Sequence, residues 1–161
     1  MEEVKFHRHL GVYGICKRYE KILVIHKSRG PYSGRFDLPG GSIEQNETIL
    51  STIIREFQEE TGLEIQIIKN IGVRDFIVPW TRPGHDHTHC HHVALFYEVK
   101  YISGDITNSP MIDDSRGAAW KGLNEINEDN SSPLVLATKE WIESNNFNID
   151  TKEYKDWINK S

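Results

Sequence analysis

The sequence predicts one α+β domain in which β-strands surround a long helix and further helices close the chain. Three observations predict this class. Segments rich in β-branched and aromatic residues recur between Gly, Pro, Asn and Ser, as strands usually do. One amphipathic stretch carries helix-starting and helix-stopping residues at its ends. The chain of 161 residues, 37% of them hydrophobic, suffices for one well-buried core and is short for two full domains. Residues 1–161 are therefore treated as a single domain.

The expected strands all lie between turn-forming residues. They are His9–Ile15, Lys21–His26, Glu64–Val73, Asp75–Trp80 and His91–Ile102. Tyr19-Glu20, between the first two, predicts a tight hairpin turn.

Two helices have clear boundary signals. The first is expected to start near Asn46–Thr48 and to end at Gly62, a typical helix-stopping residue. The second opens at Ser131-Ser132-Pro133, where a capping residue precedes proline at the first helical position. A third helix is expected over Asp150–Lys160, so that helical structure fills residues 132–161.

Composition and charge limit the classes of function. The net charge of −5 and the pI near 5.9 argue against a stable complex with nucleic acid, which needs concentrated Lys and Arg. A small phosphorylated ligand stays possible, because a divalent cation can screen acidic residues from it. No apolar run approaches the roughly 18–20 residues of a membrane span. The N-terminus is charged and lacks a signal-peptide core, and two cysteines are too few for a disulfide scaffold, so a cytoplasmic location is expected.

Three carboxylates cluster on the first helix. At about 100° per residue, Glu56, Glu59 and Glu60 share an arc of roughly 100° beside an apolar stripe. The stripe, expected to face the core, consists of Ile49, Leu50, Ile53, Ile54 and Phe57. Oxygen ligands in this arrangement suit Mg²⁺ or Mn²⁺, which keep sites for water and substrate phosphates. For an isolated Glu-Glu pair, a solvated charged face would be the more common interpretation.

The residues around this cluster favour a metal site over a solvated charged face. Gly40-Gly41 follow a proline, and the spacing reads Gly41, five residues, Glu47, seven residues, then Arg55-Glu56-Phe57-Gln58-Glu59-Glu60-Thr61-Gly62-Leu63. This pattern resembles the signature box of the Nudix hydrolases, G-x5-E-x7-R-E-U-x-E-E-x-G-U, over residues 41–63. All the fixed identities are present, with Phe57 where the family usually has an aliphatic residue. Upstream, GRFDLPGG is similar to the family's G-x-W-x-x-P-G-G, with Phe36 in place of tryptophan.

The resemblance implies a fold and an activity. The fold is the Nudix-type α/β/α sandwich, with a mixed central β-sheet and flanking helices. The activity is cleavage of a nucleoside diphosphate linked to another moiety, with Mg²⁺ or Mn²⁺ as cofactor. A nucleotide-type small molecule is then the substrate; a homodimer is an open possibility. A non-catalytic nucleotide sensor on the same fold is the alternative.

The resemblance also assigns roles to residues of the box. Glu56, Glu59, Glu60 and a backbone carbonyl of Gly40 or Gly41 match the metal ligands. Glu47 and Arg55 match positions that brace the loop against the helix, and they complete the catalytic set of Glu47, Arg55, Glu56 and Glu59. The general base is expected to be Glu59 or Glu56.

Downstream, DDSRGAAWKGLNEI resembles a family segment in which an acidic residue precedes a tryptophan-bearing strand. Asp113 and Asp114 are candidates for a base or a further ligand, or form an acidic turn.

The residues expected to contact substrate lie outside the helix. They are Arg35, Phe36, Arg74, His89 and His91. The last two belong to Pro83–His92, which holds five of the eight histidines. This run has three interpretations: a transition-metal site with Cys90, a substrate contact, or an exposed polar loop. Among the aromatic residues, some could stack on a base, although core packing is the more common role. These are Tyr32, Phe36, Phe76, Trp80 and Tyr97.

Overall fold

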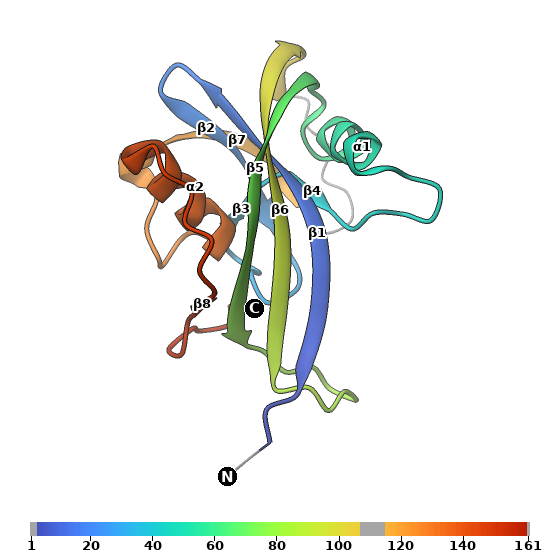
Figure 1. Cartoon of the computed structure of the whole chain (residues 1–161), viewed down its shortest axis with the longest axis vertical. Helices are drawn as coiled ribbons and strands as arrows, with labels where there is room; N and C mark the ends of the chain where they lie inside the picture. Colours follow the sequence, from blue (N-terminus) through green and yellow to red (C-terminus); the bar gives the residue numbers. More distant parts are fainter. Residues whose placement is uncertain (1–2, 107–114, 161) are drawn as a thin grey trace.

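A computed structural model describes residues 3–106 and 115–160. Its centre is a curved mixed β-sheet with the strand order β3-β2-β1-β6-β5-β8, to which β4 adds beside β1 and β7 beside β2. The helix α1 (Ile49–Thr61) lies on one side of this sheet and α2 (Pro133–Ser144) on the other (Figure 1). This is the α/β/α sandwich predicted from the sequence.

The strands have the following bounds: β1 Phe6–Arg18, β2 Lys21–Lys27, β3 Phe36–Asp37, β4 Gly40–Gly41, β5 Glu64–Pro79, β6 His89–Ser103, β7 Ser115–Gly122 and β8 Lys152–Glu153. A short 3-10 helix, Leu123–Glu125, follows β7. The tryptophan-bearing strand expected downstream is β7, and it pairs with β2.

The hairpin at Tyr19-Glu20 is confirmed. Both residues have positive φ angles, 52° and 61°, and Arg18 pairs with Lys21 across the turn. The prediction of two strands at Glu64–Val73 and Asp75–Trp80 is wrong, because they form the single strand β5. Its pairing with β6 continues through three irregularities, between Glu64 and Ile65, between Ile67 and Lys69 and between Asn70 and Gly72, so these bulges bend the strand and do not end it.

The boundaries predicted for the first helix are confirmed. Thr48 caps its N-terminus in a reciprocal pair with Ser51, and Gly62 ends it in the left-handed conformation (φ 74°). Its apolar face was only partly predicted. Leu50 and Ile54 are 46% and 52% exposed.

The buried face of α1 is rotated toward the side that carries Glu60. It consists of Thr52, Ile53, Phe57, Glu60 and Thr61. Thr61 is accommodated because its hydroxyl donates to the carbonyl of Phe57. Glu60 accepts a hydrogen bond from the backbone N–H of Gly40. Satisfied polar groups can therefore be buried in place of two aliphatic ones.

The chain after α2 differs from the prediction. The helix α2 forms as expected, with Ser132 as its cap, but the helix predicted over Asp150–Lys160 does not. This segment contains β8, which pairs with β5 at Phe76 and Ile77, and its Trp157 is buried. The indole N–H of Trp157 donates to the carbonyl of Pro31. Tertiary contacts of this kind outweigh a moderate local helix propensity.

Two apolar clusters fill the space on either side of the sheet. One lies between the sheet and α2 and includes Tyr13, Phe76 and Phe96. The other lies under α1 and includes Val12, Phe57 and Val99. Within the described chain, no helix is both long and apolar enough to cross a membrane. Cys16 and Cys90 are both free and buried.

Candidate active site

Arg55 and Glu47 connect the loop before α1 to the helix. The guanidinium donates to both carboxylate oxygens of Glu47, with a distance of 2.9 Å from Nη2 to Oε1. The Arg55 hydrogen bonds lower the pKa of Glu47 to about 2, and the same contact raises the pKa of Arg55. Bidentate pairing fixes the direction of the guanidinium as well as its position.

The remaining guanidinium nitrogen of Arg55 faces the carboxylates of the helix. Its Nη1 lies 3.0 Å from Oε1 of Glu56 and 3.1 Å from Oε2 of Glu59. Burial raises the pKa of Glu56, and the positive charge of Arg55 opposes that rise only in part. Glu56 therefore lies at the border of the core with a raised pKa, beside the positive charge of Arg55.

The glycine strand β4 runs beside these carboxylates. The backbone N–H of Gly40 donates to Oε1 of Glu60 over 2.9 Å, and Gly40 pairs with Tyr13 of β1. A side chain at Gly41 would collide with the carboxylate of Glu56, because a Cβ there would lie 2.9 Å from its Oε1. A Cβ at this position would therefore displace the Glu56 carboxylate, and glycine lets the backbone lie close to it.

The donors present suit a divalent cation such as Mg²⁺, although they do not form an all-protein cage. Among residues 3–106 and 115–160, no three His, Cys, Asp or Glu side chains are grouped as a metal-holding cluster. Mg²⁺, however, is typically bound by one or two carboxylates together with water and substrate phosphates, and it needs no all-protein cage. Glu56 and Glu59 supply two carboxylates, and the adjacent β4 backbone supplies carbonyl oxygens. Both carboxylates share Nη1 of Arg55.

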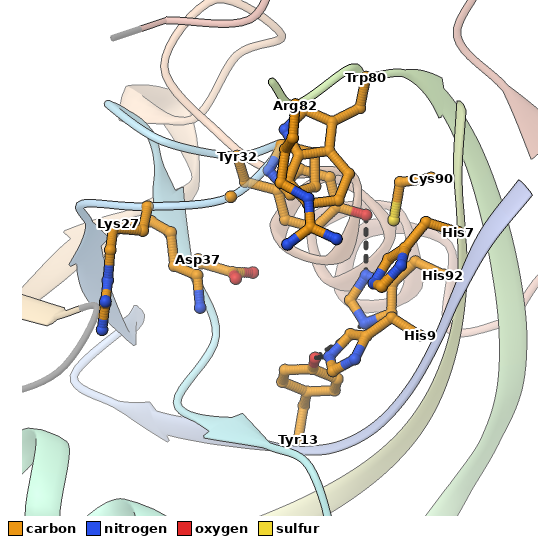
Figure 2. A pocket seen from close by; sticks show the side chains of 13 residues that line it. His7, His9, Tyr13, Lys27, Tyr32, Asp37, Trp80, Arg82, Cys90 and His92 are labelled. Carbon is orange, nitrogen blue, oxygen red and sulfur yellow. Dashed lines mark hydrogen bonds between the residues drawn. The ribbon is translucent and has the colours of Figure 1, made fainter. Parts of the chain in front are cut away.

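A cavity of about 410 Å³ opens on the α2 side of the sheet. Its wall nearest the box includes Tyr13, whose backbone pairs with Gly40, and Asp37, which lies just before β4. Its far wall includes His7, Trp80 and Arg82 (Figure 2). The cavity thus extends along β1 from Tyr13 toward the loop before β6, and among the described residues its lining includes none of the box itself.

A buried histidine organises the middle of this cavity. The two ring nitrogens of His92 each lie 2.8 Å from a phenol oxygen, Nε2 from Tyr13 and Nδ1 from Tyr32 (Figure 2). Burial lowers the pKa of His92 well below its usual value, so the imidazole is neutral. A neutral imidazole donates one hydrogen bond and accepts the other. The two hydroxyls must therefore play opposite roles toward His92.

Both arginines expected to bind substrate, Arg35 and Arg74, lie away from this cavity. Arg35 stacks over Trp157 at 3.8 Å and donates to the carbonyl of Ile158. Arg74 donates to the carbonyl of Asp150 and contacts Glu140 of α2. Both side chains are almost completely buried and hold the C-terminal segment against the sheet.

The other expected substrate contacts are also separate from the cavity lining. Phe36 packs edge-on against His26. His89 and His91 belong to the opposite face of β6 from His92, and His91 contacts Asp75 at 2.7 Å. Of the histidine run, Cys90 and His92 line the cavity. Within the described part of the chain, no group of three or more His, Cys, Asp or Glu side chains could hold a metal ion, so the structure gives no support to a transition-metal site in this run.

Among the aromatic candidates, Tyr32 and Trp80 line the cavity, whereas Phe76 and Tyr97 belong to the two cores. Asp113 and Asp114 lie outside the described residues.

Sequence reasoning missed the residues at the far end of the cavity. His7 and His9 alternate with Tyr13 on one face of β1, and Arg82 follows Trp80 in the loop before β6. The period-2 spacing of His7, His9, Gly11 and Tyr13 was the available signal. It was not used because the strand was expected to begin only at His9.

Comparisons with known proteins find a matching family model, relatives and solved structures. A family model described as NUDIX domain matches residues 5–143. An ADP-ribose pyrophosphatase from Methanocaldococcus jannaschii is 31% identical over 120 residues, which are 74% of this chain and 65% of that protein. Nucleoside triphosphatase NudI from Enterobacter sp. is 26% identical over 131 residues, 80% of this chain and 88% of that protein. A solved NUDIX hydrolase from Nitrosomonas europaea superposes with a TM-score of 0.67 at 22% identity, over 87% of this chain and 91% of that one, which shows a shared fold.

Proposed function

The chain belongs to the Nudix hydrolase family, and from that premise we propose that it hydrolyses the pyrophosphate bridge of a nucleoside diphosphate linked to another moiety. The observation that carries the proposal is the contact of one guanidinium, Arg55, with Glu47, Glu56 and Glu59 beside a strand where only glycine fits. Nucleotide hydrolases among the relatives support the substrate class.

Glu56 and Glu59 are the carboxylates that would hold Mg²⁺ or Mn²⁺, with a backbone carbonyl of Gly41 or Gly40. A bound divalent cation would neutralise charge on the pyrophosphate and lower the pKa of an attacking water. Glu60 is the third carboxylate expected to bind the cation, and it also contacts the glycine strand. It is buried and accepts from the N–H of Gly40, so it holds the glycine strand at the correct distance from the helix.

Arg55 and Glu47 act as positioning residues. Because Nε and Nη2 of Arg55 pair with Glu47, only Nη1 is directed at Glu56 and Glu59. The guanidinium therefore orients both carboxylates, and it can release them to a cation while its bonds to Glu47 stay in place.

A carboxylate must also remove a proton from the attacking water. Glu59 fits this role better than Glu56, because its side chain is 39% exposed against 15% for Glu56. Water reaches Glu59 from solvent, whereas Glu56 lies against β4. The cavity beside Tyr13 would hold the moiety next to the scissile bridge.

A panel of nucleotides tests the proposal. Nucleoside triphosphates, ADP-ribose, dinucleoside polyphosphates and nucleotide sugars are incubated with Mg²⁺ or Mn²⁺, and release of phosphate, pyrophosphate and nucleoside monophosphate is measured. Metal-dependent release of a nucleoside monophosphate from at least one compound is expected. Tight binding without turnover across the whole panel would instead indicate the non-catalytic sensor.

A further inference from the structure

The cavity carries an excess of positive charge. Among the residues that the structure describes, three basic side chains line it, Lys27, Arg29 and Arg82, against one acidic residue, Asp37. Arg82 has no hydrogen bond or ion pair within the described part of the chain, and its Nε is buried without a partner. The acidic residue nearest in sequence, Asp86, is paired with Lys5 at 3.3 Å.

Two imidazoles, His7 and His87, pack near the Trp80 ring on which Arg82 stacks. The ring centroid of His87 lies 5.3 Å from that of His7 and 5.0 Å from that of Trp80. Only 8% of His87 is exposed, and its Nε2 has no hydrogen-bond partner. A buried polar nitrogen without a partner costs free energy unless a ligand or water satisfies it.

Trp80 fixes the direction of the free guanidinium. The Arg82 guanidinium carbon lies 4.6 Å from the centroid of the Trp80 ring, a cation–π arrangement. Figure 2 shows the guanidinium directed over the cavity, between Lys27 and Asp37 on one side and His7 on the other. Stacking leaves the N–H groups in the guanidinium plane free to bind an anion.

This end of the cavity is distant from the box. His7 precedes Tyr13 by six residues on β1, which corresponds to roughly 20 Å along the strand. Since the described lining of the cavity includes no residue of the box, an anion bound at Arg82 and His7 is a different group from a pyrophosphate held at Glu56 and Glu59. We propose that Arg82, with His7, forms a second phosphate-binding subsite that is separate from the site of hydrolysis.

The phosphate has two possible sources with the same chemistry. It is either a phosphate of the substrate remote from the scissile bridge or free inorganic phosphate. Only the first source rests on the proposed function, because it requires a nucleotide that also reaches the box.

The first arm of the test uses inorganic phosphate and the metal-free, ¹⁵N-labelled full chain, with EDTA present so that no cation can bring phosphate to the carboxylates. Saturable shifts of the Trp80 indole and the imidazoles of His7 and His87 are expected. Arg82→Gln should weaken binding about tenfold or more, as expected for a charge-assisted hydrogen bond. Lys100→Gln is the matched control, because it removes one positive charge from an exposed position on β6, and it should leave binding within about twofold.

The second arm compares ADP-ribose with ADP-ribose 1″-phosphate on a Glu59→Gln background, so that no turnover interferes. Binding about tenfold tighter for the phosphorylated compound, with the preference lost in Arg82→Gln, identifies a substrate phosphate. Saturable binding of inorganic phosphate with equal affinities for the two nucleotides identifies free phosphate.

Two results would overturn the subsite: no saturable phosphate binding together with no nucleotide preference, or equal losses in Arg82→Gln and Lys100→Gln. Neither readout requires hydrolysis, so failure of the proposed function would appear separately, in the nucleotide panel.

Discussion

Arg55 pairs with both carboxylate oxygens of Glu47, and this contact orients the guanidinium toward Glu56 and Glu59. Arg55→Lys keeps the charge but cannot reproduce the two parallel hydrogen bonds. We expect kcat to fall by roughly 10- to 100-fold, the usual effect of losing a residue that orients metal ligands. Steady-state kinetics at saturating Mg²⁺ measure the effect. A rate equal to that of the unmodified protein would show that bidentate pairing has no part in catalysis.

Glu56 should make the metal-free protein less stable at neutral pH. Its pKa is raised by burial, so protonation stabilises the folded state below the ordinary carboxyl pKa, and this contribution is lost as the pH rises through the raised value. Glu56→Gln keeps the shape without the charge. We therefore expect a higher thermal midpoint than the unmodified protein at pH 7 in EDTA, together with lost hydrolysis. A lower midpoint would mean that the contact with Arg55 outweighs the burial of the charge.

A side chain at Gly41 should impair catalysis and leave the fold intact. Its Cβ would lie 2.9 Å from Oε1 of Glu56, and the mobile carboxylate, not the backbone, would move. Gly41→Ala should therefore lower kcat about tenfold or more and weaken Mg²⁺ activation, with little loss of folding stability. Ser42→Ala, one residue further along an exposed loop, is the control. Equal activity of both variants would exclude a role for this close approach.

Arg74 should contribute to stability and not to substrate affinity. Its buried guanidinium binds the carbonyl of Asp150 and the carboxylate of Glu140. Arg74→Met should lower the free energy of unfolding by about 2 kcal/mol, because backbone and carboxylate acceptors lose their partner. Urea denaturation measures the change, and Lys100→Met is the exposed control. A raised KM at unchanged stability would instead place Arg74 at the substrate.

His92 should make the fold sensitive to mild acid. Its pKa lies well below that of a histidine in the unfolded chain, so the unfolded state binds the additional proton and stability is lost as the pH falls below about 6.5. One such group contributes a slope of at most about 1.4 kcal/mol per pH unit. Urea midpoints between pH 7.5 and 5 should fall less steeply in His92→Gln than in the unmodified protein. Parallel pH profiles would contradict a neutral, buried His92.

The box residues were predictable from the sequence because their spacing is set by one helix and one tight loop. Glu47, Arg55 and Glu56 lie on one helix and the turn before it, so short-range geometry brings them together. Gly41 reaches them through the pairing of β4 with β1, and only the resemblance to the family box identified it. The capping residue Thr48 and the stop at Gly62 were readable for the same reason.

The cavity was not predictable in this way. Its wall joins β1, the loop after β2 and the loop before β6, and their proximity depends on the parallel pairing of β1 with β6. Arg35 and Arg74 resembled substrate ligands because both are cationic and near the expected site. Only the fold shows that the C-terminal segment surrounds them, and that segment was itself expected to be a helix.

We expect the carboxylates of α1 to hold the divalent cation that drives hydrolysis. The rate of hydrolysis of the best nucleotide in the panel is measured during a Mn²⁺ titration, for the unmodified protein, Glu56→Gln and Glu59→Gln. Each substitution should lower the maximal rate by about 100-fold or more and shift the Mn²⁺ dependence to higher concentration. Unchanged rates and unchanged Mn²⁺ dependence in both variants would contradict it.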